Sequence, residues 1–88
     1  MSNNKDLTET MAYNAEDLRQ ERIKEILKDV KSALEDRGFQ AINQISGYLI
    51  SNDPAYISSN RNARNIIQEV ERYEIIEELV RYYLSENK

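Results

Sequence analysis

Apolar residues recur at helical spacing along residues 15–37, with charged side chains between them. They lie three or four positions apart and define one stripe: Ile23, Ile26, Leu27, Val30 and Leu34. A repeat of about 3.6 residues is typical of an amphipathic helix. Gly38 follows directly, and glycine readily adopts the left-handed conformation that ends many helices. We therefore predict a first helix over residues 15–37.

Residues 41–51 predict a second helix, in a stretch that is almost free of charge. Its expected apolar face combines four residues: Ile42, Ile45, Tyr48 and Leu49. Asn52-Asp53-Pro54 ends this helix, because proline cannot continue the backbone hydrogen bonding. Asp53 can cap a new helical turn and Pro54 suits its first position. We expect a short turn of helix over residues 54–57.

Between residues 61 and 85 the spacing is helical throughout, but the apolar stripe changes phase. The first face, formed by Ile66, Ile67 and Val70, would continue at positions 74, 77 and 81, which are charged. The next apolar residues lie elsewhere: Ile75, Ile76, Leu79, Val80, Tyr83 and Leu84. A straight helix cannot hold both sets on one side. We predict two helices, 61–71 and 74–85, with a break near Glu71–Glu74; one long helix with a second face for a partner is the alternative.

Residues 1–14 follow neither a helical nor a strand period, and they are polar and rich in hydroxyl groups. Terminal segments of this kind rarely pack. We predict a flexible N-terminal tail over residues 1–14, followed by a single helical domain over residues 15–88. No alternating run of apolar and polar residues is long enough to indicate strands. The predicted fold class is all-α, with four main helices.

The size and composition of the chain predict a homodimer. The chain has 88 residues and neither cysteine nor histidine, so its small core has no disulfide or thiolate metal site to reinforce it. Burying more surface between two copies is the remaining route. The lack of cysteine also fits a reducing compartment, and we expect a cytoplasmic protein. No apolar run approaches the roughly 18–20 residues that span a bilayer, so we expect no membrane insertion.

Signatures of catalysis are missing from the sequence. It has no glycine-rich phosphate loop, no zinc-type spacing of ligands and no histidine to act as a general base. Glu77 and Glu78 could perform acid–base chemistry only in a buried setting. Their position beside Arg81 instead predicts a solvated helix face with ion pairs. We expect no enzyme, no catalytic residue, no metal and no cofactor.

A nucleic-acid-associated helical dimer is the alternative function. Four arginines are interspersed with tyrosines in the C-terminal half: Arg61, Arg64, Arg72 and Arg81. Arginine together with aromatic side chains can hold single strands. However, the net charge is −4, and residues 61–88 hold six acidic and five basic side chains. No basic patch forms in the sequence, so nucleic acid is the less favoured partner.

Tyrosines are the best candidates for an interface. The chain has six tyrosines, one phenylalanine and no tryptophan, and tyrosine suits half-buried positions with one wet end. Tyr82 and Tyr83 are adjacent near the end of a predicted helix, where neighbours cannot both face one core. The predicted interface residues are Tyr48, Tyr56, Tyr82 and Tyr83. A place at the edge of the core is the alternative for each.

Two threonines in the tail are candidates for phosphorylation. Thr8 and Thr10 flank Glu9 in a segment that a kinase could bind in extended form. A phosphate adds about −1.5 to −2 charges and can pair with arginine or repel carboxylates. Composition alone does not select these threonines, because most threonines in tails are not modified.

Two stretches of the chain carry motifs of a known family. The first, within residues 42–57, contains Ile-Asn-Gln-Ile, Gly-Tyr-Leu and Asp-Pro-Ala-Tyr-Ile; the second contains Ala63-Arg64-Asn65, Glu71-Arg72 and residues 74–80. Over about residues 24–84 the sequence resembles the IreB-like family of small bacterial regulatory proteins. It departs from the family pattern at three positions: Ala41 replaces a proline, Asn52 a glycine and Tyr73 an aspartate that would cap the final helix.

The resemblance implies a helical, dimeric, cytoplasmic substrate of transmembrane Ser/Thr kinases whose extracellular PASTA domains sense the cell wall. It also implies a phosphorylated threonine in the tail. Thr10-Met11-Ala12-Tyr13 is the segment most similar to the family's Thr-apolar-x-aromatic pattern, and Thr8 is the second candidate. The expected function is a non-enzymatic, phosphoregulated signalling adaptor in cell-envelope stress and antibiotic-resistance control. Its downstream protein partner is not named by the sequence.

Overall fold

The computed structural model describes the backbone from Ser2 to Glu86 and the side chains of residues 15–85. The described elements are all helical: α1 (Ser2–Asp36), α2 (Ala41–Ser51), α3 (Ala63–Ile67) and α4 (Arg72–Glu86), with short 3₁₀ turns η1 (Pro54–Tyr56) and η2 (Asn60–Asn62). The predicted all-α class with four main helices is confirmed. Within this range, no helix combines the length and the apolar character needed to cross a membrane.

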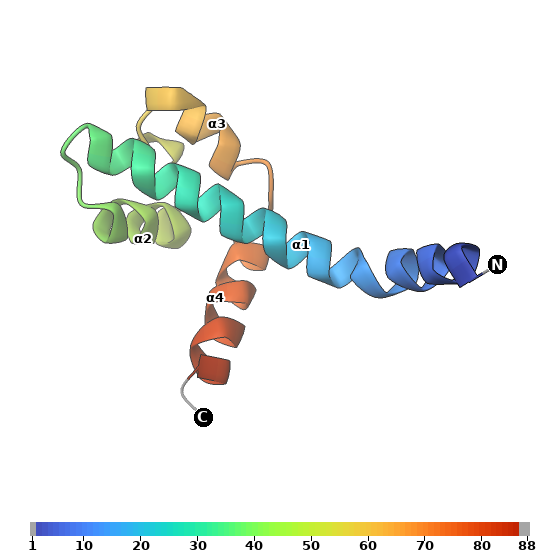
Figure 1. Cartoon of the computed structure of the whole chain (residues 1–88). Helices are drawn as coiled ribbons and strands as arrows, with labels where there is room; N and C mark the ends of the chain where they lie inside the picture. Colours follow the sequence, from blue (N-terminus) through green and yellow to red (C-terminus); the bar gives the residue numbers. More distant parts are fainter. Residues whose placement is uncertain (1, 87–88) are drawn as a thin grey trace.

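The long helix α1 is the axis of the fold. Figure 1 shows α2 and α3 on opposite sides of the C-terminal half of α1, while α4 meets α1 further back and then projects away from it. The apolar stripe of α1 supplies five core residues: Ile23, Ile26, Val30, Ala33 and Leu34. The remaining buried apolar residues come from the other elements: Ala41, Tyr48, Ile57, Ala63, Ile67 and Ile75. The core therefore lies around the second half of α1.

The predicted ends of the first two helices are confirmed by their backbone geometry. Gly38 has φ +81° and its N–H donates to the carbonyl of Glu35 at 3.0 Å, which closes the end of α1. Asn52, at the position where the resemblance places glycine, has φ 63° and donates its N–H to Tyr48 O at 2.8 Å. Asparagine tolerates this left-handed conformation better than most residues, so the departure is accommodated.

The short helical turn predicted after α2 is also present, as η1. Its N-cap is Asp53, whose Oδ1 accepts a hydrogen bond from the N–H of Ala55 at 3.0 Å, and Pro54 occupies the first helical position. The sequence signal here is local, because both the cap and the proline lie within the turn that they specify.

The predicted start of the first helix is wrong. The backbone of α1 is helical from Ser2, whereas the apolar stripe on which the prediction rested begins only at Ile23. Helical hydrogen bonding needs no apolar stripe, so periodicity does not reveal polar turns of helix. The predicted flexibility of residues 1–14 stays a prediction, because their side chains lie outside the described residues.

The predicted break in the C-terminal segment is present, but it lies at Gln68–Glu71 instead of Glu71–Glu74. The first two N–H groups after α3 donate to carbonyls three residues back, at 3.2 and 3.0 Å, which ends that helix in a tight turn. At the start of α4, a carboxylate oxygen of Glu74 accepts the N–H of Glu71 at 3.3 Å. This reach-back cap replaces the aspartate that Tyr73 displaces, and α4 therefore begins two residues earlier than predicted.

The third helix is also shorter than the predicted 61–71. Arg61 and Asn62 have φ angles of 51° and 63°, in the left-handed region, so α3 begins only at Ala63. The side-chain amide of Asn60 donates to the carbonyl of Ala33 at 2.9 Å and fixes this irregular loop on α1. Such a contact between distant residues cannot be read from local spacing.

The predicted apolar face of α2 is found in the structure except at Ile42: Tyr48 is buried, and Ile45 and Leu49 pack against the core. Ile42 is 80% exposed, and the buried residues of this helix are Ala41 and Tyr48. On another side of α2 the ring of Tyr56 lies against Gly47, where an added Cβ would be only 2.4 Å from a ring carbon. Gly47 is therefore needed for close packing of Tyr56 on the helix.

Candidate functional site

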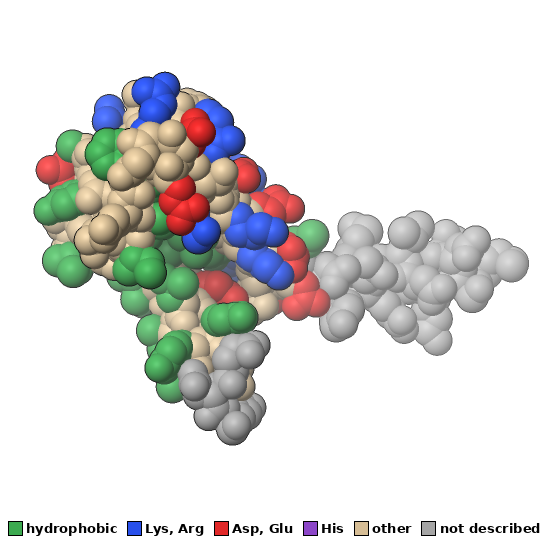
Figure 2. Space-filling model, turned by 60° about the vertical axis from the view of Figure 1, so that its left-hand side comes forward, with side chains coloured by type: hydrophobic (Ala, Val, Ile, Leu, Met, Phe, Trp, Pro, Cys, Tyr) green, Lys and Arg blue, Asp and Glu red, His purple; other side chains and the backbone are tan. Residues whose placement is uncertain are grey.

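The most unusual surface of the molecule is an apolar stretch along α4. We call it the α4 apolar face; it comprises Ile76, Leu79, Val80, Tyr82, Tyr83 and Leu84. These side chains are between 40% and 68% exposed. Figure 2 shows hydrophobic side chains gathered along the projecting helix. Six neighbouring apolar side chains exposed on one helix are typical of a protein-binding surface.

A hollow separates α4 from α1 beside this face. Its apolar lining comes from Ile23 and Leu27 of α1 and from Leu79 and Tyr82 of α4, while Lys24 stands with other charged side chains at its margin. In Figure 1 the two helices cross near the start of α4 and diverge beyond it. An apolar hollow next to an exposed apolar face gives a partner both a ridge and a groove to contact.

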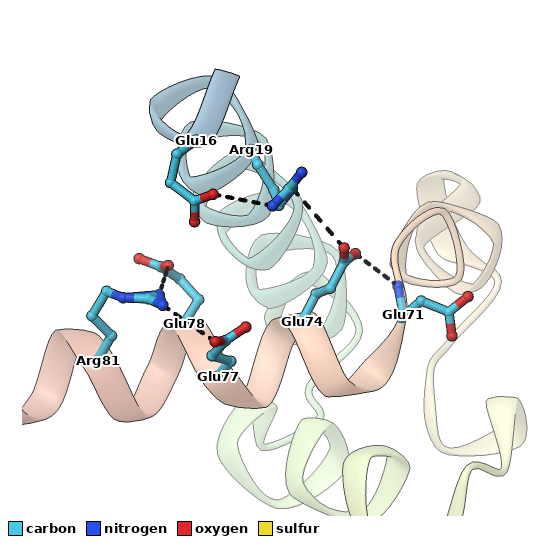
Figure 3. A network of polar contacts seen from close by, with 7 residues as sticks. All are labelled: Glu16, Arg19, Glu71, Glu74, Glu77, Glu78 and Arg81. Atoms are coloured by element: carbon cyan, nitrogen blue, oxygen red, sulfur yellow. Dashed lines mark hydrogen bonds and ion pairs between the residues drawn. The ribbon is translucent and has the colours of Figure 1, made fainter. Parts of the chain in front are cut away.

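The polar side of α4 carries an ion-pair network (Figure 3). Arg81 lies 3.3 Å from Glu77 and 3.4 Å from Glu78, both within α4, and Arg19 of α1 lies 3.1 Å from Glu16 and 4.0 Å from Glu74. Pairs this exposed contribute only about 0–1 kcal/mol each. Glu77 therefore lies on a solvated helix face, as the sequence predicted, whereas the side chain of Glu78 is 20% exposed and lines the hollow between α4 and α1.

The four tyrosines predicted at an interface lie in different environments. Tyr48 is 3% exposed and belongs to the core, which leaves it little surface for a partner. Burial raises the pKa of the Tyr48 phenol above its ordinary value; the Arg72 guanidinium opposes this effect and the Glu71 carboxylate adds to it. Tyr56 packs on α2, whereas Tyr82 and Tyr83 are both exposed on α4.

The arginines on which nucleic-acid binding would depend all have partners within the chain. Arg64 donates to the carbonyl of Ile57 at 2.8 Å, and Arg72 to that of Leu49 at 2.6 Å. Arg61 donates to the hydroxyl of Ser32 at 2.6 Å. Arg81 pairs with two carboxylates of its own helix. Arg61, Arg64 and Arg72 join different elements of the fold, and Arg81 is paired within α4, so the structure adds no support for a phosphate-binding surface.

The predicted phosphorylation sites, Thr8 and Thr10, have side chains outside the described residues. Among residues 15–85, no cluster of three or more acidic side chains that could hold a metal ion is found. Among residues 15–85, α4 carries the largest number of exposed large apolar side chains of any helix, which makes the α4 apolar face the candidate functional surface. Sequence reasoning identified only its tyrosines, although the change of phase in the apolar stripe already pointed to a second face.

A known protein family matches the sequence over nearly all of these elements. The family described as IreB regulatory phosphoprotein matches residues 8–85. The chain belongs to this family. The match includes α2 and α3, most of α1 and α4, and the two threonines of the tail, so the IreB assignment applies to the whole helical domain. The family's description identifies the protein as a regulatory phosphoprotein, which agrees with the signalling function expected from the motifs in residues 42–57 and 63–80.

Proposed function

We propose that this protein is a non-enzymatic, phosphoregulated signalling adaptor in the cytoplasm. In this proposal it is a substrate of a PASTA-type Ser/Thr protein kinase and acts in cell-envelope stress and antibiotic-resistance control. The observation that carries the proposal is membership of a regulatory phosphoprotein family over residues 8–85. The α4 apolar face supports an adaptor, because a protein that acts by contact needs a surface on which another protein can pack.

Thr10 is the proposed phosphorylation site, with Thr8 as the second candidate. These are the only two threonines in the chain, so any phosphothreonine must lie at one of them. Two acidic residues, Glu16 and Asp17, follow closely in sequence and their side chains are exposed. A phosphate at Thr10 would concentrate negative charge at this end of α1 and weaken contacts with acidic partners.

Incubation of the full chain with a cognate kinase, followed by mass spectrometry, tests this proposal. We expect one phosphothreonine, lost in Thr10→Ala and kept in Thr8→Ala, which is a matched control two residues away. A phosphate that persists in Thr10→Ala and disappears in Thr8→Ala would move the site to Thr8. Absence of phosphate from residues 1–14 contradicts the proposal.

We also propose that the protein is a homodimer, in which the α4 apolar face packs against a second copy. Ile75 is the one α4 residue among the buried apolar side chains of the described chain, so most of the apolar surface of this helix is left for intermolecular contact. In a symmetric dimer this surface would meet its own equivalent and also gain access to the apolar hollow beside it. Tyr82 and Tyr83 would then lie in the interface.

A further, unidentified protein downstream of the kinase remains part of the proposal. To find this protein, Thr10→Ala and Thr10→Glu are used as baits, and the proteins bound to each bait are identified by mass spectrometry. A protein that binds the two baits to different extents depends on charge at this position. Equal recovery of every protein by both baits contradicts regulation through Thr10.

A further inference from the structure

The attachment of α4 to the rest of the molecule is narrow. This helix has 15 residues, yet Ile75, in its first turns, is its one contribution to the buried core of the described chain. The partly buried hydrophobic residues packed against the core come from elsewhere: Leu27, Ile45, Leu49, Ile66 and Val70. Beyond Ile75 the exposed fraction of the apolar residues rises from about 40% at Ile76 and Leu79 to 65% at Leu84, so the helix is attached most tightly at its start.

Polar contacts also attach α4 to the rest of the molecule through its first turn. Arg72, the first residue of α4, donates to the carbonyl of Leu49 near the C-terminus of α2 at 2.6 Å. Glu74 lies 4.0 Å from Arg19 of α1 and also caps the helix through the N–H of Glu71. In Figure 3, Arg19 and Glu74 face one another across the junction of the two helices. Because α4 is one continuous helix, these contacts at its first turn set the direction of the whole helix.

The segment before α4 and the space beside it both permit a change of direction. Residues 68–71 are not helical and join α3 to α4 through a tight turn. Further along α4, Leu79 and Tyr82 border the hollow that separates this helix from α1. A short irregular segment next to a loosely packed element is the usual structure of a hinge.

We propose that α4 is a hinged arm that pivots about Gln68–Glu71, with Arg72 as the residue that latches it to α2. In a single chain the latch limits the arm's excursions. When the α4 apolar face is covered, packing along the whole helix selects one direction from this ensemble. Arg72 is thus a positioning residue for the interface, although it is not part of the apolar face. This inference goes beyond the proposed function and does not depend on phosphorylation.

The hinge is tested by measuring the distance between two spin labels with double electron–electron resonance. Because the chain has no cysteine, Lys31→Cys on α1 and Ser85→Cys on α4 give two specific labelling sites, both exposed. Every labelled chain also carries Val80→Glu in the α4 apolar face, so that the chain stays monomeric with this face uncovered and the measured distances lie within one molecule; this monomeric chain is the wild-type reference for the widths. Arg72→Ala is compared with Arg81→Ala, a matched control because Arg81 pairs only with Glu77 and Glu78 of its own helix among the described contacts.

We expect the distance distribution to become about twofold wider in Arg72→Ala, because more directions of the arm are then populated. Arg81→Ala should keep the wild-type width. A second label pair within the body, Lys31→Cys with Ser51→Cys, should keep a narrow distribution in both variants. Equal widths for Arg72→Ala and Arg81→Ala overturn the proposal. Broadening of the body pair in Arg72→Ala also overturns it, because the latch would then hold the core and not the arm.

Discussion

In both α1 and α4, apolar residues lie three or four positions apart and charged side chains fill the gaps. The stripe of α1 is covered by α2 on one side and α3 on the other, and its core residues are at most 2% exposed. The face of α4 has similar residues but remains 40–68% exposed, because α4 leaves the body after its first turns. Helical periodicity therefore identifies which residues form an apolar face, but not whether that face packs against the same chain or against another molecule.

Two leucines offer the largest contrast between these regions. Leu34 in α1 is completely buried and Leu84 in α4 is 65% exposed. We expect Leu34→Ala to lower the free energy of unfolding by about 2–5 kcal/mol, from lost burial and a cavity. Leu84→Ala should change the free energy of unfolding of the monomer by no more than about 0.5 kcal/mol.

Urea denaturation at low protein concentration, monitored by circular dichroism, measures both values for the monomer. Comparable losses for Leu34→Ala and Leu84→Ala would mean that α4 is part of the cooperative core. The distinction between the covered and the uncovered helix would then be wrong.

A glycine in the body gives an intermediate effect that depends on its neighbour. Gly47→Ala places a Cβ against the ring of Tyr56, so we expect a net loss of about 1 kcal/mol from overpacking despite the better helix propensity of alanine. With Tyr56→Ala already present, the clash is gone and Gly47→Ala should stabilise the chain by about 1 kcal/mol. A double-mutant cycle from thermal or urea unfolding measures this change of sign. The same sign in both backgrounds would show that Tyr56 does not pack on α2.

The smallest expected effect concerns the buried phenol of Tyr48. Its pKa is raised in the folded state, so it contributes full stability below the unfolded pKa of about 10. As the pH rises above that value, the unfolded chain loses the proton first and stability falls until the folded pKa is passed.

Replacement of Tyr48 by phenylalanine isolates this contribution. As the pH is raised from about 9 to above 10, the free energy of unfolding of wild type should fall relative to that of Tyr48→Phe, which has no phenol proton to lose. The matched control is Tyr82→Phe on α4, because Tyr82 is 62% exposed. An identical pH dependence for both variants would place Tyr48 in contact with water.

Much of the fold can be predicted from the sequence because its signals are local. The turn chemistry of Gly38 and Asp53-Pro54 lies within a few residues of the ends that it specifies, and both ends are found where predicted. The change of phase after Val70 indicated a break, since no straight helix holds both stripes on one side. Its position was missed by about a turn, because the cap formed by Glu74 was not recognised.

Features that depend on distant contacts were not predictable. Tyr48 was expected at an interface and is buried in the core. Tyrosine suits both environments, so the residue type alone does not distinguish them. Ile42 was expected in the core and is exposed, since the face of α2 is set by the approach of α1 and not by apolarity alone. The contact of Arg72 with Leu49 joins residues 23 positions apart and has no local signal. For the candidate site, the sequence indicated two tyrosines of the α4 apolar face but not its extent.

The central claim is that a second copy covers the α4 apolar face, and sedimentation equilibrium of the full chain tests it most directly. At tens of micromolar we predict a dimer for wild type, and for Val80→Glu a dissociation constant raised by about tenfold or more, because a carboxylate would be buried without a partner. Leu18→Glu, at an exposed apolar position of α1, should dimerise like wild type. A wild-type monomer at this concentration, or equal dimerisation of Val80→Glu and wild type, contradicts the claim.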